Sequence, residues 1–361
     1  MSYIAPRTKA FAHCDRLGRW QAGEQPAPVT VEWDLSNRCV LGCQDCHFAH
    51  THTRGPWAAR GATGDRRLPV AFSGTGDLAD PALVMRGLSE MARAGVEGIV
   101  WSGGGEPTTH PAWDAIVAYA ASQGLRQGMY TLAGLLDWRG AKALARAADW
   151  VVISLDAADA EAYGREKGVP ASRFQAATDG IRMLAETGGA VVGVSFLLHA
   201  ENWTQAPQML QLSRSLGAAY ATFRPAIRFD PAAPRYAIDD RAWVCDALPL
   251  LDALEQEPEC EVDALRFAEY ASWRGHGYDT CHGVKLHATV TPDGRVWVCP
   301  NRRGVPGSSI GDLGREPFAA IWARHPGRVT VDDQCRVMCR LHLMNGPLVE
   351  IFRPQPHAAF V

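Results

Sequence analysis

The sequence predicts an α/β protein: a partial (β/α)6 barrel of the TIM type, followed by a small α+β domain rich in cysteine. Between residues 28 and 227, six short apolar runs alternate with helical patterns, which is typical of parallel strands joined by helical crossovers. Beyond about residue 271 the pattern changes to an alternating hairpin, a short helix and grouped cysteines. This change indicates a second structural unit.

The predicted barrel strands are short and regularly spaced. They cover residues 28–35, 97–104, 125–132, 149–157, 190–199 and 219–227. Helices are expected between them at 80–96, from about 111, and near 138–147, 172–188 and 203–216. Reactive residues follow several of these strands, and the catalytic residues of barrels lie at the carboxyl ends of strands. A barrel therefore fits better than an open nucleotide-binding sheet.

Five segments are predicted along the chain. In the cysteine-rich part, the run 285–299 alternates and turns at Pro292-Asp293-Gly294, a combination typical of a hairpin. The amphipathic stretch DDRAWVCDALPLLDALEQE predicts a helical connection. The segments are an N-terminal arm (1–27), the barrel (28–230), a helical linker (231–270), the cysteine-rich domain (271–345) and a C-terminal tail (346–361).

Composition and charge exclude several classes of function. With 47% hydrophobic and 21% charged residues the chain is ordinary for a globular protein. Its formal charge of −3 provides no basic surface for nucleic acid or an anionic membrane. No apolar run is long enough for a membrane span, and the first residues lack the apolar core of a secretory signal. We expect a cytoplasmic protein that binds neither nucleic acid nor membrane.

Seven of the ten cysteines fall into two groups. The cytosol keeps thiols reduced, so grouped cysteines there are metal ligands more often than disulfide partners. The isolated cysteines are Cys14, Cys245 and Cys260. The front group is Cys39, Cys43 and Cys46, and the back group is Cys281, Cys299, Cys335 and Cys339.

The front group lies in RCVLGCQDCHFAHTHTRG, residues 38–55. Its CxxxCxxC spacing needs a loop that curls around the metal, and Gly42 provides the freedom to do so. A structural zinc ion needs four closed ligands, usually supplied as two pairs. An iron–sulfur cubane held by three cysteines instead leaves one iron open. We favour the cubane. The alternative is a zinc site whose fourth ligand is a histidine, either His47, His50 or His52.

A glycine run follows the second predicted strand, in WSGGGEPTTHP. Glycines at Gly103–Gly105 allow the backbone to approach a ligand closely. The carboxylate of Glu106 is an acceptor suited to an ammonium group. Taken alone, the run would suit a tight turn better than a ligand site.

CxxxCxxC and GGEP, each after its strand, together resemble the radical S-adenosylmethionine (SAM) superfamily over about residues 28–227. ISLDA after the fourth strand and HAEN after the fifth fit further stretches of that family. The resemblance implies a four-iron, four-sulfur (4Fe–4S) cluster on Cys39, Cys43 and Cys46, whose open iron binds the SAM amine and carboxylate. It also implies SAM contacts from Gly104, Gly105, Glu106, Ser154 and Arg165.

One position departs from the family pattern. An aromatic residue usually precedes the third cysteine and packs near the adenine, but this chain has Asp45 there. We expect Phe48 to pack against the adenine from a shifted position. The following loop, 47–79, contains Arg54 and the three histidines, and it either contacts substrate or is a solvated connection.

The back group supplies four thiolates, the number that closes a cubane or a zinc site. GRVWVC, IGDLGREPFAAIW and CRVMC resemble the SPASM/twitch extension of radical SAM enzymes. Since a full SPASM domain needs more cysteines, the resemblance implies the shorter twitch type, although its usual CxxC is CxxxC here. It implies one auxiliary 4Fe–4S cluster held by all four residues, Cys281, Cys299, Cys335 and Cys339. The alternative is a cluster with one open iron that binds substrate directly.

The resemblance implies an enzyme that cleaves SAM to a 5′-deoxyadenosyl radical and abstracts a hydrogen atom. We first expect a small polar substrate, a sugar or aminocyclitol whose carbinol is oxidised or epimerised. An epimerase would need a thiol hydrogen donor, for which Cys245 and Cys260 are candidates, although a structural role fits each better. The alternatives are a maturase of a ribosomal peptide or protein side chain, and a non-catalytic zinc scaffold. An electron donor such as flavodoxin or ferredoxin is the expected partner.

Overall fold

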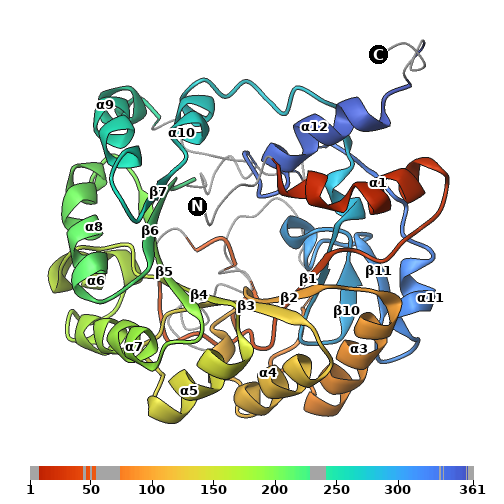
Figure 1. Ribbon diagram of the computed structural model, residues 1–361, viewed down its shortest axis with the longest axis horizontal. Helices are drawn as coiled ribbons and strands as arrows, with labels where there is room; N and C mark the ends of the chain where they lie inside the picture. Colours follow the sequence, from red (N-terminus) through yellow and green to blue (C-terminus); the bar gives the residue numbers. More distant parts are fainter. Residues whose placement is uncertain are drawn as a thin grey trace.

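The computed structural model describes residues 8–43, 46–48, 51–53, 74–227, 241–332, 335, 337–354 and 356. Over these residues the sheet has the strand order β11-β10-β9-β1-β2-β3-β4-β5-β6-β7, and β12 pairs with β8 apart from it. All pairings from β9 through β1 to β7 are parallel. The sheet curves around a centre with helices along its outer side (Figure 1), which confirms the predicted barrel type.

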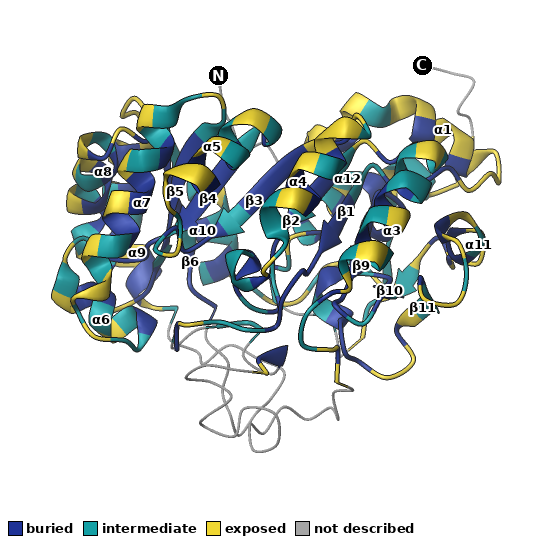
Figure 2. Cartoon of the chain, turned by 90° about the horizontal axis from the view of Figure 1, so that it is seen from below, coloured by how far each residue is buried: buried dark blue, intermediate teal, exposed yellow. Residues whose placement is uncertain are grey.

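The six predicted barrel strands are all present. They are β1 (Thr30–Trp33), β2 (Gly98–Trp101), β3 (Arg126–Thr131), β4 (Trp150–Ser154), β5 (Val191–Leu198) and β6 (Tyr220–Pro225). The helices between and after them are α3 (Pro81–Ala94), α4 (Trp113–Ser122), α5 (Trp138–Ala147), α6 (Ala160–Lys167), α7 (Arg173–Thr187) and α8 (Ala206–Ser215). The strands are buried, whereas these helices expose their outer faces (Figure 2).

Helix α3 shows how local chemistry sets the element boundaries. The Asp80 carboxylate accepts a hydrogen bond from the Ala82 N–H at 2.9 Å, and Pro81 occupies the first turn. The helix ends at Gly95, whose φ of 95° is left-handed. Its buried residues recur at helical spacing and pack onto the sheet: Val84, Leu88 and Met91.

The predicted helical linker contributes a strand to the sheet. Helix α9 (Trp243–Glu255) and helix α10 (Ala264–Ala271) form as expected. Between them β7 (Cys260–Val262) pairs in parallel with β6. The strand is three residues long and lies among acidic residues, so its sequence carries no alternating pattern. The linker therefore extends the barrel rather than only connecting two units.

The predicted hairpin of the cysteine-rich part is confirmed as β9 (His287–Val290) and β10 (Arg295–Trp297). Its turn closes with a hydrogen bond from the Gly294 N–H to the Thr291 carbonyl at 2.9 Å. Strand β9 pairs in parallel with β1, so the hairpin continues the barrel sheet. The remaining elements are β11 (Ser309–Asp312), α11 (Phe318–Trp322), β8 (Thr280–Cys281), β12 (Val329–Thr330) and α12 (His342–Phe352).

The N-terminal arm packs on the C-terminal helix. Helix α1 (Cys14–Gln21) lies beside α12 (Figure 1), and the Gln21 side chain donates to the Ile351 carbonyl at 2.9 Å. A small apolar cluster joins Leu17 to Leu348. The segment boundaries given above stay predictions. Across the described ranges, no helix combines the length and apolarity needed to cross a membrane.

Candidate active site

A cavity of about 320 Å³ lies at the carboxyl ends of the strands, between the two cysteine groups. Cys43 and Cys46 of the front group and Cys339 of the back group all line it. Residues from the ends of β4, β5 and β6 complete its wall, among them Ser154, Leu197 and Pro225. This is the edge at which barrel active sites form.

The front cysteine loop is tied to the end of α6. The Gly42 N–H donates to the Lys167 carbonyl at 2.7 Å. Gly168 follows with a left-handed φ of 61°, and a Cβ there would lie 2.5 Å from the Gly42 carbonyl oxygen. The close approach of these two backbones therefore requires glycine at 168 and fixes where the cysteines lie.

The front thiols suit a bound cationic cluster. Cys39, Cys43 and Cys46 are each half-buried. Burial raises the pKa of Cys39 well above its ordinary value, and the neighbouring Cys43 and Cys46 raise it further. Thiolates so placed need a positive charge beside them, which iron ions supply. The donor set fits the cluster that the sequence predicts.

The histidines of this loop take different positions. His47 lines the cavity. The His52 Nε2 lies 3.8 Å from the Cys46 Sγ, and burial lowers the pKa of His52 to about 4, so its ring is neutral. Asp45, His50 and Arg54 lie outside the described residues.

The glycine run packs against the segment that leads into the cysteine loop. Gly103 and Gly104 have left-handed φ values of 33° and 65°. The Gly105 N–H donates to the Ser36 carbonyl at 2.7 Å. A Cβ on the three glycines in turn would lie 2.1 to 2.2 Å from Arg303, Asn37 and Arg38. The run is thus required by close protein contacts, and it positions the residues just before Cys39.

Glu106 joins this glycine loop to the end of β3. Its Oε1 accepts from the hydroxyls of Thr131 at 2.6 Å and Thr108 at 2.5 Å and from the Thr108 N–H at 3.2 Å, and its Oε2 accepts from the Leu132 N–H at 2.9 Å. Burial raises the pKa of Glu106, although these hydrogen bonds oppose the shift. Since each carboxylate oxygen has two lone pairs and Oε2 accepts one hydrogen bond here, an ammonium contact at Oε2 stays compatible with this arrangement.

Ser154 belongs to a buried network that the sequence analysis did not identify. The Lys167 ammonium donates to the Ser154 hydroxyl at 3.1 Å and forms an ion pair with Asp156. Asp156 in turn accepts from the Leu197 N–H at 2.7 Å. Burial lowers the pKa of Lys167, but Asp156 and Cys43 raise it more, so the net shift is upward. All three of Ser154, Asp156 and Lys167 line the cavity.

Arg165 does not lie where the resemblance implied. It is exposed and is not among the residues that line the cavity, whereas Lys167, two residues later on the same helix, is buried there. Residues two apart on a helix point in different directions. In the described residues, Lys167 is therefore the cation beside Ser154.

Phe48 lies in the cavity wall, as expected of a residue that packs against the adenine. The Arg303 guanidinium carbon lies 4.3 Å from the centre of its ring, a cation–π contact. The adenine contact itself stays a prediction. The position is consistent with an aromatic residue displaced beyond Cys46.

Charged residues buried near the cavity connect the two units. Glu32 on β1 accepts from Arg303 at 2.5 Å and forms an ion pair with Arg340, and both arginines come from the cysteine-rich part. Burial alone would raise the pKa of Glu32, but the two arginines lower it to about 2. Asp34 lies 3.2 Å from Arg303, yet burial raises its pKa to about 8.

The back cysteines gather at one place. Each of Cys281, Cys299, Cys335 and Cys339 is half-buried. Burial and then the neighbouring Cys339 raise the pKa of Cys299 to about 12, and the same two causes raise that of Cys281. Arg302 donates to the Cys335 Sγ at 3.3 Å. These four thiols also fit a cluster that supplies positive charge.

The isolated cysteines lie away from the cavity. Cys245 is exposed on α9, and Cys260 is half-buried on β7. Neither lines the cavity. The structure therefore does not place the two thiol hydrogen-donor candidates at the site.

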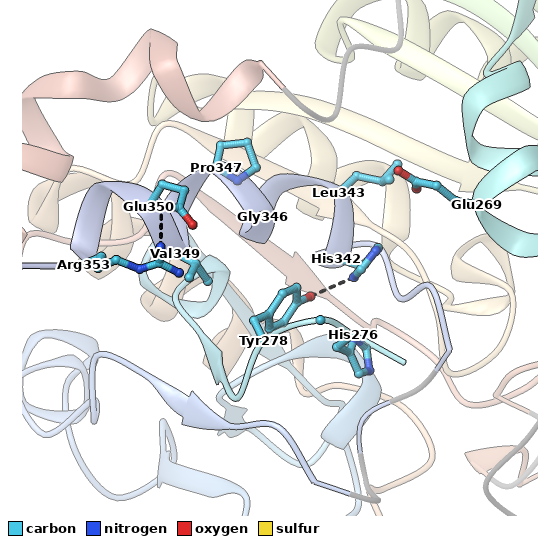
Figure 3. A pocket seen from close by; sticks show the side chains of 11 residues that line it. Glu269, His276, Tyr278, His342, Leu343, Gly346, Pro347, Val349, Glu350 and Arg353 are labelled. Carbon is cyan, nitrogen blue, oxygen red and sulfur yellow. Dashed lines mark hydrogen bonds and ion pairs between the residues drawn. The ribbon is translucent and has the colours of Figure 1, made fainter. Parts of the chain in front are cut away.

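A second cavity, of about 300 Å³, lies on the cysteine-rich part (Figure 3). The Tyr278 hydroxyl and the His342 Nδ1 lie 2.9 Å apart within it, and Glu350 pairs with Arg353 at 3.0 Å. Burial raises the pKa of Tyr278, and Cys339 and Cys281 raise it further, so this tyrosine adjoins the back group. No cysteine lines this cavity. The first cavity is therefore the candidate active site.

Two family models match the chain. The model described as the radical SAM superfamily covers residues 33–213, and the model SPASM, described as an iron-sulfur cluster-binding domain, covers residues 281–340. Similar curated proteins include a PqqA peptide cyclase of Gluconobacter oxydans, 26% identical over 83% of this chain and 77% of that protein. A probable GTP 3′,8-cyclase of Methanosarcina mazei is 27% identical over 57% of each protein.

Similar solved structures agree on the fold. Streptococcus suis SuiB bound to precursor peptide SuiA has a TM-score of 0.64 at 14% identity, over 90% of this chain and 71% of that one. Native anSMEcpe with bound AdoMet has a TM-score of 0.58 at 10% identity, over 82% of this chain and 80% of that one. At these identities the likeness extends to the fold alone.

Proposed function

Because the chain belongs to the radical SAM superfamily and carries a SPASM iron–sulfur domain, we propose that it is a maturase that modifies a residue of a peptide or protein substrate. Enzymes of this kind contain 4Fe–4S clusters and bind SAM, which together supply a 5′-deoxyadenosyl radical that removes a hydrogen atom from an unactivated C–H bond. The residues of this chain bind and orient the reactants and keep water away.

The observation that carries the proposal is the shared cavity. Cys43 and Cys46 line one part of it and Cys339 lines another. A substrate held between them would face the SAM cluster on one side and the auxiliary cluster on the other. We assign Cys39, Cys43 and Cys46 to the first cluster. We assign to the auxiliary cluster Cys281, Cys299, Cys335 and Cys339.

The residues proposed to hold SAM surround the front group. Lys167 offers an ammonium to a carboxylate, and Asp156 keeps that ammonium in place. The Ser154 hydroxyl, which donates to Asp156 at 2.9 Å, would turn from Asp156 to the SAM carboxylate when SAM binds. Gly104, Gly105 and Glu106 stay the proposed contacts of the amine, and Phe48 that of the adenine.

The apolar part of the cavity wall excludes water. It consists of side chains that offer no hydrogen bond, Leu197, Pro225, Ile227, Val337 and Met338. Keeping water out strengthens every electrostatic contact inside the cavity and protects a reactive intermediate from side reactions. No acid–base triad is required for this step.

A peptide substrate is better supported than the small carbinol that the sequence first suggested. A relative that covers 83% of this chain is a PqqA peptide cyclase, and SuiB was solved with a precursor peptide. A radical SAM enzyme that oxidises or epimerises a sugar-like carbinol stays the second candidate. A flavodoxin or ferredoxin remains our proposed electron donor.

The test is a paired turnover assay under anaerobic conditions. The reconstituted protein is incubated with SAM and dithionite, in one arm with candidate precursor peptides and in the other with candidate sugar alcohols. We expect 5′-deoxyadenosine in both arms and a mass change only in a peptide. A loss of two hydrogen atoms from an alcohol, with every peptide unchanged, would contradict the proposal.

A further inference from the structure

Three arginines line the side of the cavity nearest the back cysteines. Arg224 lies at the end of β6, Arg266 on α10, and Arg340 directly follows Cys339. They come from three separate parts of the chain, so the fold brings them together. Such a concentration of like charge at partly buried positions is costly unless an anion offsets it.

Two of the three arginines keep donors to spare. Arg340 is occupied by its ion pair with Glu32. Arg224 acts on the Tyr130 hydroxyl, whose pKa burial raises and Arg224 lowers, and the Arg266 Nη2 donates to the Met338 carbonyl at 3.3 Å. A guanidinium has five N–H donors.

The Nε of Arg266 is the clearest unused donor. It is buried and has no hydrogen-bond partner among the residues that the structure describes. Among those described residues, no carboxylate lies within ion-pair distance of Arg224 or Arg266. A buried, charged donor that lacks a partner marks a place where a ligand can supply one.

The repulsion between these cations is visible in the electrostatics. Burial lowers the pKa of Arg266 to about 10; the charges of Arg224 and Arg340 lower it further, whereas those of Asp263 and Cys339 oppose the shift. A bound anion would relieve this repulsion.

The acidic residues of the cavity already have partners. Asp156 pairs with Lys167, and Glu166 lies 3.1 Å from His199. Among the residues that the structure describes, no carboxylate forms an ion pair with Arg224 or Arg266, although the charge of Asp263 acts on Arg266. The part of the cavity near the back group therefore carries arginine charges to which no described carboxylate is paired.

We propose that Arg224 and Arg266 bind a carboxylate of the substrate and hold it beside the residue that reacts. The inference rests on the proposed peptide substrate and deepens it: an acidic side chain or a free C-terminus lies next to the modified residue. A planar guanidinium matches a carboxylate with two parallel hydrogen bonds, so it selects orientation as well as charge.

The experiment measures which peptides the protein retains. Immobilised holoprotein with SAM is exposed anaerobically to a synthetic pool of acetylated, amidated octapeptides in which Asp, Glu, Asn and Gln are equally frequent. A second pool has free C-termini, which separates the two sources of carboxylate. Bound peptides are sequenced by mass spectrometry for the wild type, for R224Q, R266Q, the R224Q/R266Q double variant and R224K, and for the surface control R139Q, whose side chain is 84% exposed.

We expect the wild type to enrich acidic residues, or free C-termini, about tenfold over their neutral counterparts, as for hydrogen bonds to charged groups. The R224Q/R266Q double variant should lose this preference and R139Q should retain it. R224K should retain only part of it, because lysine keeps the charge but cannot form the two parallel hydrogen bonds. Equal recovery of acidic and neutral peptides by the wild type, or an unchanged preference in the double variant, would overturn the inference.

Two further measurements separate other roles of these arginines. If the double variant no longer binds SAM in equilibrium dialysis, the arginines bind SAM rather than the peptide. If it loses the visible absorbance of the auxiliary cluster, they stabilise the cluster at Cys339. Either result overturns the inference. SAM cleavage to 5′-deoxyadenosine is scored separately, so failure of the proposed function is distinguishable from failure of the carboxylate site.

Discussion

At the scale of single residues, Asp34 is the most unusual buried group. Burial raises its pKa from an ordinary value of 3.8 to about 8, and the nearby Arg303 offsets this only in part. The folded state therefore prefers the protonated carboxyl, whereas the unfolded chain ionises near pH 3.8. Its contribution to stability is present below that pH and is lost as the pH rises toward 8.

This linkage predicts a pH-dependent effect of D34N, whose amide cannot ionise. The free energy of unfolding of the wild type, relative to D34N, should fall as the pH rises from about 5 to about 8. Urea denaturation of both proteins across that range measures it. A difference between the two proteins that stays constant with pH would contradict the assignment.

The residues of the site differ in how readily the sequence reveals them. Cysteine spacing predicts both groups because their proposed function as cluster ligands fixes residue type and number. Lys167 and Asp156 carry no such signal, since a lysine near a helix end normally faces solvent. Only the ion pair with Asp156, made through tertiary structure, explains why Lys167 is buried while Arg165 is exposed.

At the scale of elements, the glycine loop after β2 decides where the first cysteine lies. Gly104 has a left-handed φ of 65°, and a Cβ added to it would lie 2.1 Å from the Asn37 Oδ1. Gly124 has a similar φ of 76° but open space around it. Comparing alanine at these two positions therefore separates the cost of backbone strain from the effect of a clash with Asn37.

We predict different outcomes for G104A and G124A. G124A should cost about 1 to 2 kcal/mol from backbone strain alone and leave iron content unchanged. G104A should be less stable and retain less iron, because it displaces the segment that leads to Cys39. Thermal unfolding and iron analysis after anaerobic reconstitution measure both effects. Equal iron content in the two variants would refute the positioning role.

Periodicity predicts the elements better than their pairing. The six barrel strands and the hairpin follow from local patterns, and all are present. Neither β7 nor the pairing of β9 with β1 was predicted. β7 is too short to show a pattern, and pairing across more than 250 residues depends on the assembled sheet rather than on local sequence.

At the scale of the whole molecule, ion pairs to the buried Glu32 hold the two cysteine groups around one cavity. Glu32 on the first barrel strand binds Arg303 and Arg340 from the distant cysteine-rich part. Strand β9 adds a continuous backbone connection to β1. The barrel and the SPASM region therefore both contribute to the wall of one cavity, the candidate active site.

This arrangement predicts that the two groups act at different stages. C43A should abolish 5′-deoxyadenosine formation, because the first cluster loses a ligand. C335A should still cleave SAM but yield no modified peptide, if the auxiliary cluster acts after hydrogen abstraction. Chromatography of 5′-deoxyadenosine and mass spectrometry of the peptide separate the two results. A C335A protein that gives normal product would show that the auxiliary site is not needed for the reaction.

The central claim is that the cavity between the cysteine groups holds a peptide C–H bond beside SAM. The most direct measurement is transfer of deuterium from a labelled peptide into 5′-deoxyadenosine, followed by mass spectrometry under anaerobic turnover. Our account predicts one deuterium in the recovered nucleoside for a peptide that the enzyme modifies. Recovery of unlabelled 5′-deoxyadenosine alongside a modified, fully deuterated peptide would contradict it.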